Sequence, residues 1–289
     1  MTQSTGDRPP GKGIDRTSWM GRLPDRVPVG DLTIAGTHQS CAHHGLAARC
    51  QNPGFDVPAQ LRAGIRYLDV RCRVHHGELR LYHEFVSQRA ALDSVLAACA
   101  EFLEQRPSET VLMRIRQEYS TQPQDRFRRL FAAYLRAGGV EDRVYLDPVV
   151  PRLGEVRGKV LVLSGSSYVG GLRWKDEAVM DVQDCWRVER PSVKLRQVLA
   201  HAERALDRRS SEHADPRLFV NHLSGHRLPL LTPRTVAARV NPAVALAVRA
   251  LRERHRANGP RAGLGVLAMD FADEAPGLVR ALVGWNFAH

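Results

Sequence analysis

The sequence predicts an α/β fold, built as a single distorted TIM-type (βα)8 barrel. Apolar runs of strand length alternate with helical patterns along the 289 residues, which is typical of a parallel sheet with short crossovers. No Ser/Gly-rich linker and no change of composition divides the chain, and its length is within the range of one α/β barrel. We therefore expect an N-terminal tail or strap over residues 1–28 and one barrel over residues 29–289. An open, doubly wound sheet is the alternative, but the Gly-x-Gly-x-x-Gly turn that often accompanies it is lacking.

Eight strands are expected from the apolar runs. They are Leu32–Ala35, Ile65–Val74, Thr110–Arg116, Val144–Leu146, Lys159–Leu163, Val179–Val182, Leu218–Asn221 and Gly265–Met269. A further short run, Leu79–Tyr82, is expected to pair with the second strand as a hairpin.

Two helices can be placed from local signals. Apolar side chains over residues 92–103 recur at helical spacing and form one stripe, and Pro107 is expected to end that helix. A later helix is predicted to begin at Asn241-Pro242, with Asn as the N-cap and Pro in the first turn. Gly259-Pro260 is expected to end it.

The chain is strongly basic. Its 42 Lys and Arg against 31 Asp and Glu give a net charge of +11, which favours anionic partners such as nucleic acid, an acidic membrane surface or a phosphate substrate. No RNP-like, zinc-finger or helix-turn-helix signature is present, so we expect no nucleic-acid partner. No stretch approaches the roughly 20 apolar residues of a membrane span. Any membrane contact is therefore expected to be peripheral.

Compartment and assembly are less constrained by the sequence. Residues 1–30 are polar and lack the apolar core of a secretory signal, so a cytoplasmic location is expected, with secretion as the alternative. The five cysteines are an odd number without metal-site spacing. Cys41 and Cys50 could form a disulfide under oxidising conditions, and reduced thiols are the equal alternative. We expect a monomer.

Several polar side chains fall where strands end, which is where barrel enzymes carry their chemistry. They are His38 and Gln39 after the first strand, Asp69 and Arg71 on the second, His83 from the hairpin, Arg116 on the third, Asp184 and Trp186 near the sixth, and Asp270 after the eighth. Taken singly, each has a structural interpretation as a loop histidine, a strand ion pair or a helix cap. Together they suit phosphodiester cleavage, which needs a base, an acid and a cationic group that holds the phosphorane.

The order of these motifs resembles the X-domain family of phosphatidylinositol-specific phospholipases C, in particular the small bacterial enzymes. The similarity covers roughly residues 28 to 285. It is carried by Ile34-Ala-Gly-Thr-His-Gln-Ser40, Gln60-Leu-Arg-Ala-Gly-Ile-Arg-Tyr-Leu-Asp-Val-Arg-Cys72, Leu81-Tyr-His83, Pro107-Ser-Glu-Thr-Val-Leu-Met113, Arg157-Gly-Lys-Val-Leu-Val-Leu163, Val182-Gln-Asp184 and Met269-Asp270.

The resemblance implies a reaction in which the inositol 2-hydroxyl attacks its own phosphate, releasing diacylglycerol and a cyclic inositol phosphate. By the same resemblance, His38 is the general base oriented by Asp270, and His83 protonates the leaving oxygen. Arg71 binds the phosphate and Asp69 orders the site around it. The implied inositol contacts come from Arg116, where the family often has lysine, from Asp184, and from Trp186, where it commonly has tyrosine.

Two departures from the family pattern concern activity and head group. Gln39 replaces an aspartate that is expected to pair with the arginine and assist the acid, so a weakened enzyme or a protein that only binds inositol phosphates or acidic lipid stays open. A second inositol-contacting arginine of the family falls on Ser164 or Gly165, which leaves a glycosylated inositol lipid open as the substrate.

No metal or other cofactor is expected. Metal-using relatives place an additional carboxylate near the second strand, where this chain has Arg71, and a fixed guanidinium there would repel a cation. The remaining rival is a metal-dependent glycerophosphodiesterase on a similar barrel. That enzyme would need a Glu-x-Asp pair on or after the second strand, and Asp69 is the one carboxylate in Leu68-Asp69-Val70-Arg71.

Overall fold

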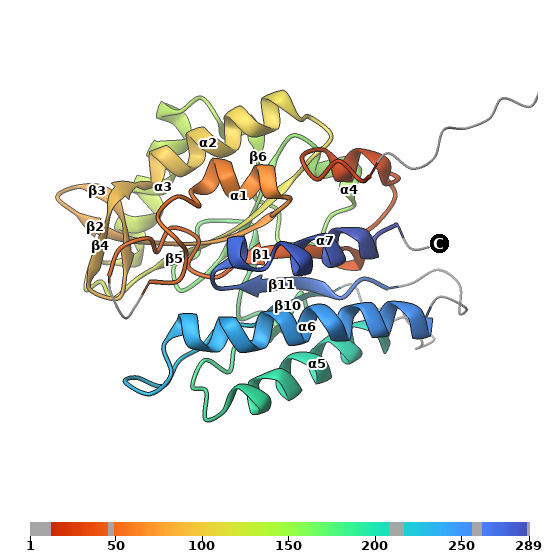
Figure 1. The fold of residues 1–289 in the computed structure, drawn as a ribbon. Helices are drawn as coiled ribbons and strands as arrows, with labels where there is room; N and C mark the ends of the chain where they lie inside the picture. Colours follow the sequence, from red (N-terminus) through yellow and green to blue (C-terminus); the bar gives the residue numbers. More distant parts are fainter. Residues whose placement is uncertain (1–12, 46–48, 208–216, 256–261, 288–289) are drawn as a thin grey trace, which may run out of the picture.

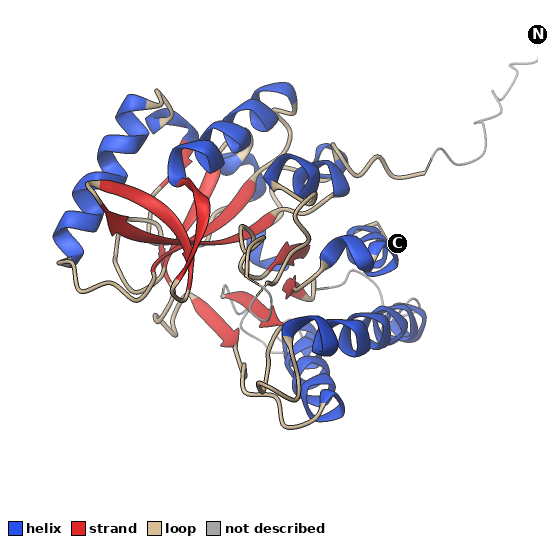
Figure 2. Ribbon diagram, turned by 60° about the vertical axis from the view of Figure 1, so that its left-hand side comes forward, coloured by secondary structure: helices blue, strands red, loops and turns tan. Residues whose placement is uncertain are grey.

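A curled β-sheet forms the centre of the protein, and helices cover its outer side (Figures 1 and 2). The computed structural model describes residues 13–45, 49–207, 217–255 and 262–287. Eleven strands make up the sheet, and its main path runs β6-β7-β5-β2-β1-β11-β10-β9, parallel at every pairing. The strands are β1 Thr33–Thr37, β2 Tyr67–His75, β3 Glu78–His83, β4 Val86–Ala91, β5 Val111–Gln117, β6 Val144–Tyr145, β7 Val160–Ser164, β8 Leu172–Arg173, β9 Met180–Gln183, β10 Leu218–His222 and β11 Gly265–Met269.

The α-helices lie between strands along most of the chain, except that β2, β3 and β4, and likewise β7, β8 and β9, follow one another without an α-helix. They are α1 Val57–Ala63, α2 Leu92–Gln105, α3 Gln124–Ala137, α4 Leu153–Val156, α5 Pro191–Asp207, α6 Pro233–His255 and α7 Pro276–Trp285. Every residue of β1, β7, β10 and β11 is buried, because helices pack on the outside and side chains fill the inside. Continuous apolar runs are the usual sequence of such strands. The predicted α/β barrel is confirmed.

All nine predicted strand segments, the hairpin included, are present, with ends that differ by at most two residues. The two strands that the sequence did not reveal are β4 and β8. The β4 segment, Val86-Ser-Gln-Arg-Ala-Ala91, lacks an apolar alternation, and β8 has two residues, too few for any period.

The barrel is open along one side. The main path ends at β6 and β9, and β8 pairs with β7 alone; within the described residues no strand pairing joins β9 to β6 or β8. Side chains meet across this gap instead. Trp174, directly after β8, contacts His222 of β10 edge-on, with ring centroids 5.9 Å apart. This open seam is the distortion of the TIM-type barrel.

The start predicted for the last long helix is wrong. Helix α6 begins at Pro233, and Pro242 lies inside it. Asn241 is not a cap: its side chain is buried and its Nδ2 donates to the Asp270 carbonyl at 2.9 Å. The Asn-Pro pair is a valid local start signal, but Pro233 supplies an earlier one. The expected end at Gly259-Pro260 lies outside the described residues. The predicted helix over 92–103 is confirmed as α2.

Residues 13–28 cross the end of the barrel opposite the strand termini that carry the predicted site. Trp19 and Met20 are fully buried, and Trp19 Nε1 donates to the Gly64 carbonyl. A buried ion pair anchors this segment. Arg66 donates twice to Glu109 Oε2, at 2.9 and 2.8 Å, and to the carbonyls of residues 16 and 17 at 3.2 and 2.9 Å. Glu109 in turn accepts from the backbone of residues 20 and 21.

We predict that Glu109→Gln lowers the free energy of unfolding by about 3–5 kcal/mol, because Arg66 would be left as a buried charge without its carboxylate. Urea unfolding followed by circular dichroism measures the loss. Asp125→Asn is the control: its partner Arg128 is 59 % exposed, so that pair should contribute less than about 1 kcal/mol. Similar losses in the two variants would contradict the role given to the buried pair.

Candidate active site

Strand register brings the predicted residues together at one end of the sheet. Thr37 of β1 pairs with Met269 of β11, so the residues that follow, His38 and Asp270, emerge side by side. On the neighbouring pair, Asp69 of β2 lies opposite Arg114 of β5, and two residues later Arg71 lies opposite Arg116. The β3 strand ends at His83, one residue beyond the predicted end at Tyr82, and the hairpin delivers this histidine as expected.

Gly36 of the Gly-Thr-His segment is required by the close approach of β2. A Cβ atom on Gly36 would lie 2.7 Å from Cδ1 of Tyr67, which is fully buried. A larger residue would displace the strand end that carries His38.

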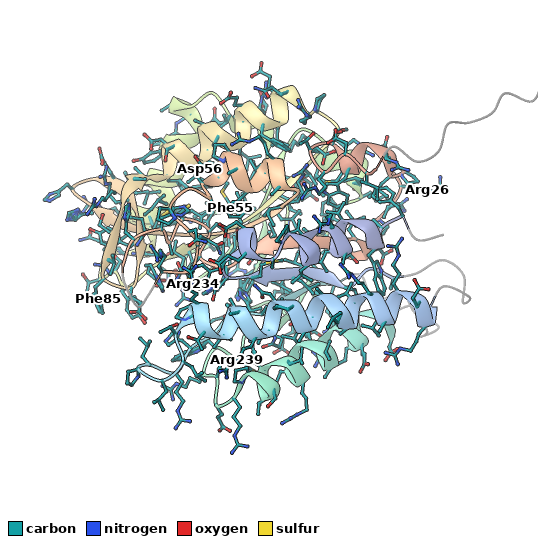
Figure 3. The ribbon with its side chains drawn as sticks, in the orientation of Figure 1. Arg26, Phe55, Asp56, Phe85, Arg234 and Arg239 are labelled. Atoms are coloured by element: carbon teal, nitrogen blue, oxygen red, sulfur yellow. The ribbon has the colours of Figure 1, made fainter. Side chains whose placement is uncertain are left out.

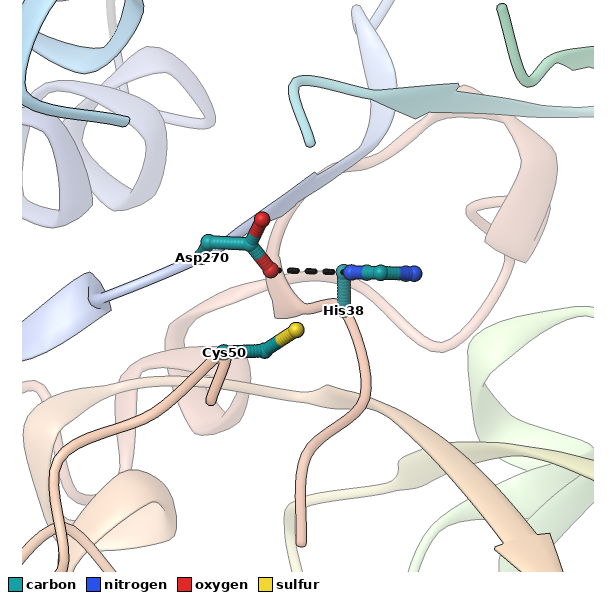
Figure 4. Close-up of side chains that lie close together, drawn as sticks. All are labelled: His38, Cys50 and Asp270. Carbon is teal, nitrogen blue, oxygen red and sulfur yellow. Dashed lines mark hydrogen bonds and ion pairs between the residues drawn. The ribbon is translucent and has the colours of Figure 1, made fainter. Parts of the chain in front are cut away.

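His38 is held from both sides of its ring. Its Nδ1 lies 2.8 Å from Asp270 Oδ1 (Figure 4). Its Nε2 lies 3.0 Å from Arg71 Nη2. Since a guanidinium can only donate, Nε2 accepts, and the Nδ1 proton is donated to Asp270. Gln51 fixes the backbone beneath, because its Nε2 donates to the carbonyls of His38 and Met269 at 2.9 and 3.0 Å.

Asp69 is the buried anion beneath the site. Its carboxylate accepts from Arg71 Nη2 at 3.1 Å and from Arg114 Nη1 at 3.4 Å, and its side chain has no exposure. Burial alone would raise the pKa of Asp69, but the charges of Arg71 and Arg114 hold it well below its ordinary value. Asp69 is therefore ionised, and it fixes both guanidiniums.

Gln39 occupies the place of the carboxylate that the family pattern predicts. It is buried, with a φ of 46°. With the amide oriented so that both of its ends are satisfied, its oxygen accepts from Arg71 Nε at 3.2 Å and from Nη1 at 2.6 Å. Glu118, which is 1 % exposed, adds a carboxylate 3.4 Å from Arg71 Nη1. Arg71 thus keeps a full set of oxygen partners without the aspartate.

A cavity of about 240 Å³ opens above this cluster. Of the nine predicted residues, eight line it, namely His38, Gln39, Arg71, His83, Arg116, Asp184, Trp186 and Asp270. The ninth, Asp69, lies beneath the cavity and contacts its lining through Arg71 and through the backbone amide of Gln39. Cys50, Glu84, Glu118, Tyr119 and His226 also line it and were not predicted as site residues.

Asp184 and Trp186 sit on a loop that is braced from behind. Gln183 accepts from the backbone amide of Cys185 at 2.8 Å and from Lys194 Nζ at 3.1 Å, and the same ammonium donates to the Cys185 carbonyl. Trp186 is 46 % exposed at the rim. Burial would raise the pKa of Asp184, but nearby positive charges lower it to about 2: first His222, which is protonated only at such low pH, and then His38, Arg114 and Arg71. The loop presents a fixed anion and an aromatic ring to the cavity.

His222, Trp174 and Arg114 form a layer under the cavity that the sequence did not reveal. The His38 and His222 rings meet edge-on at 5.5 Å, His222 meets Trp174, and the Arg114 guanidinium lies 3.7 Å from the Trp174 ring centroid. Burial lowers the pKa of His222 to about 3, so the ring is neutral at physiological pH. The contacts form a closed ring, which runs from His38 through His222, Trp174, Arg114, Asp69 and Arg71 back to His38.

Alternation along β5 was the available signal for two of the unpredicted residues. Arg114, Arg116 and Glu118 recur every second residue and so share the inward direction. His222 carries no such signal, because a histidine at the end of a buried strand is more often a packed core residue.

Comparison with known proteins agrees with this geometry. The family model for the phosphatidylinositol-specific phospholipase C X domain matches residues 33–165. The 1-phosphatidylinositol phosphodiesterase of Listeria monocytogenes is 29 % identical over 286 residues, which cover 93 % of this chain and 85 % of that protein. Residues 33–165 therefore carry the phosphatidylinositol-specific phospholipase C X domain, and the chain as a whole is similar to bacterial enzymes of that family.

Solved structures of phosphatidylinositol-specific phospholipases C share the fold of this chain. The Listeria monocytogenes structure has a TM-score of 0.80 and 27 % identity, and the match covers 94 % of this chain and 99 % of that one. A variant of the Staphylococcus aureus protein has a TM-score of 0.76 over 94 % and 98 % of the two chains, and at 21 % identity it supports the fold alone.

We predict that Asp184 makes this protein less stable in acid. The pKa of Asp184 is depressed in the folded state to about 2, from 3.8. Its contribution is therefore complete above pH 4 and is lost as pH falls from 3.8 through 2. In urea titrations between pH 5 and 2, Asp184→Asn should lose less free energy of unfolding than the parent, by up to about 2 kcal/mol. The exposed Asp142→Asn is the control, and identical acid profiles for the parent and Asp184→Asn would contradict the assignment.

Proposed function

We propose that this chain cleaves phosphatidylinositol by intramolecular, metal-independent phosphoryl transfer. The inositol 2-oxygen forms a bond to phosphorus while its proton passes to His38. The bond from phosphorus to the glycerol oxygen breaks, and His83 gives that oxygen a proton. The products are diacylglycerol and a cyclic inositol phosphate.

The observation that carries this proposal is the arrangement of His38. Asp270 accepts a hydrogen bond from Nδ1–H, so the lone pair of the ring is on Nε2, and His38 lines the cavity as the base. His83 borders the same cavity and is 6 % exposed, in a position suited to the acid. Two histidines around a guanidinium supply the base, the acid and the charge stabilisation that the reaction needs.

Arg71 must exchange partners when the substrate binds. In the structure its Nη2 donates to the same Nε2 atom that is to accept the hydroxyl proton. A phosphate oxygen is a stronger acceptor than imidazole, because it is ionised. We infer that the phosphate draws Arg71 away from His38 and thereby frees the base, while Asp69 keeps the guanidinium in place.

The charges around Arg71 support a reaction without a divalent cation. Calcium and magnesium require several oxygen ligands at close range. The nearest buried carboxylates, Asp69 and Glu118, are already engaged by guanidiniums. The Arg71 charge therefore does the work that a cation would do on the phosphate.

We assign recognition of the head group to Arg116, Asp184 and Trp186. Arg116 and Asp184 offer a donor and an acceptor to inositol hydroxyls, and the Trp186 ring forms one wall. The same groups would accept an inositol ring that carries a sugar, so a glycosylated inositol lipid is a second candidate substrate.

The two rival functions are less well supported. A metal-dependent glycerophosphodiesterase would need a free pair of carboxylates on β2, whereas Asp69 is bound to two arginines. A protein that only binds would be expected to have lost the ordering of Arg71, whereas Gln39 and Glu118 maintain it.

We predict that His38→Ala and His83→Ala each reduce turnover of phosphatidylinositol by at least about 10²-fold, the lower range for loss of an acid or base. Release of inositol phosphate from vesicles measures this, and affinity for soluble inositol phosphate should survive. His75→Ala, an exposed histidine outside the cavity, should behave as the parent. Near-parental turnover in both cavity variants would exclude the two-histidine mechanism.

We propose that the rim of the cavity docks on the membrane surface. Phe85, Tyr119, Trp186, Leu228 and Leu230 are 74, 60, 46, 48 and 75 % exposed. The hairpin with Phe85 and the loop before α6 project at the same end of the molecule (Figures 1 and 3). Tyr119 and Trp186 also line the cavity. Within the described residues no helix has the length and hydropathy to cross a membrane.

Since one chain supplies the whole cavity lining, we propose that it acts as a monomer.

We predict that the double variant Phe85→Ser/Leu230→Ser binds phosphatidylinositol-containing vesicles at least about tenfold more weakly. A tenfold change in affinity corresponds to about 1.4 kcal/mol, and full insertion of either side chain contributes a larger transfer free energy than that. Sedimentation with sucrose-loaded vesicles measures the affinity. Leu246→Ser is the matched control, since Leu246 is 66 % exposed in the middle of α6. Equal loss in the control, or none in the double variant, would place the docking surface elsewhere.

A further inference from the structure

Cys50 lies beside the His38–Asp270 pair in the cavity, and the mechanism proposed above gives it no part. A ring nitrogen of His38, the Cys50 sulfur and a carboxylate oxygen of Asp270 all lie within 4.8 Å of one another. Figure 4 shows the Cys50 sulfur pointing toward the other two side chains. All three residues line the cavity, so a small ion can reach them from solvent.

The backbone holds these three groups in place. The Cys50 amide donates to the Ala42 carbonyl at 3.0 Å, and the Cys50 carbonyl accepts from Phe271, next to Asp270, at 2.7 Å. The neighbouring Gln51 is bound to the carbonyl of His38. The segment at residues 50–51 therefore ties the two strand ends together and fixes the direction of the thiol.

We propose that His38, Cys50 and Asp270 form an inhibitory site for a thiophilic divalent cation such as Zn²⁺ or Cd²⁺. One nitrogen, one sulfur and one oxygen ligand are a set that Zn²⁺ accepts, with bonds of about 2.0–2.3 Å and a fourth position open to water. Ligand atoms around such an ion lie about 3.3–3.8 Å apart, so the three side chains need to shift by only about 1 Å.

Binding exchanges protons for the cation. The Cys50 sulfur loses its proton to solvent as the sulfur–metal bond forms. The ion takes the place between His38 Nδ1 and Asp270, and the ring stays neutral because its proton moves from Nδ1 to Nε2, where the hydrogen bond from Arg71 is given up. One thiolate and one carboxylate then neutralise the two charges of the ion, so the neighbouring Arg71 faces a neutral centre. A hard cation gains little from sulfur, so Ca²⁺ and Mg²⁺ should not bind here.

Occupation of the site would remove the base from the reaction. With the cation on Nδ1, the ring is no longer oriented by Asp270 and the open position of the ion faces the substrate cavity. The inhibitory effect rests on the proposed role of His38 in catalysis. The binding itself does not, and it can be measured without any turnover.

Titration with Co²⁺ tests the site directly, since a cobalt–thiolate bond absorbs in the near ultraviolet. The exposed Cys185 is first replaced by serine in all proteins, so that it contributes no signal. In this background the parent should develop the thiolate band with one equivalent of Co²⁺, and Zn²⁺ should abolish it. Cys50→Ser should not show it. Absence of the band in the parent, or the same band in Cys50→Ser, would overturn the proposal.

Inhibition is the second arm of the test. Activity on phosphatidylinositol is measured with buffered free Zn²⁺ or Ca²⁺, relative to the activity of each variant in EDTA, so a difference in basal turnover does not enter. Zn²⁺ should inhibit the parent, and Cys50→Ser should need at least about tenfold more Zn²⁺. Equal Zn²⁺ sensitivity of the two would refute the inhibitory site. A thiolate band with Co²⁺ in a chain that cleaves no phosphatidylinositol would leave the cation site standing and refute the proposed function.

Discussion

The buried carboxylate of Asp69 is the interaction on which the rest of the site depends. Two guanidiniums, Arg71 and Arg114, converge on it from neighbouring strands, and without this anion they would repel each other in the barrel interior. Arg71, held by Asp69, in turn contacts His38, and Arg114, held by the same carboxylate, lies over the Trp174 ring. One ionised group thus sets the positions of the phosphate ligand and of the base together.

The contacts around Asp69 also help to close the barrel at its open seam. Backbone pairing does not join β8 to β9 within the described part of the chain, so side chains have to hold the two edges. Trp174, after β8, meets His222 of β10, the strand next to the β9 edge, and both belong to the chain of contacts that passes through His38 and Asp69. Closure of the barrel and alignment of the base therefore rest on the same contacts, and neutral His222 adds no charge that would oppose protonation of His38.

The sequence predicted the fold and the cavity lining well, because both follow from local patterns. Buried strands have continuous apolar runs, and polar residues at strand ends converge by geometry. What it missed depends on tertiary context. Glu118 takes over from the missing carboxylate. Its spacing from Arg114 indicates that it points inward, but not that it meets Arg71 on the neighbouring strand. Pro242 has the local signature of a helix start, yet α6 runs through it because an earlier proline begins the helix. The β8 strand was too short for any pattern.

The central claim is that the guanidinium and two histidines, without a divalent cation, close a cyclic phosphodiester on the inositol ring. Phosphorus NMR of the products released from phosphatidylinositol vesicles in excess EDTA tests it most directly. Our account predicts steady turnover in EDTA with the cyclic inositol phosphate as the first product and the acyclic one appearing later. Turnover that stops in EDTA and returns with calcium, or an acyclic product from the first time point, would contradict it.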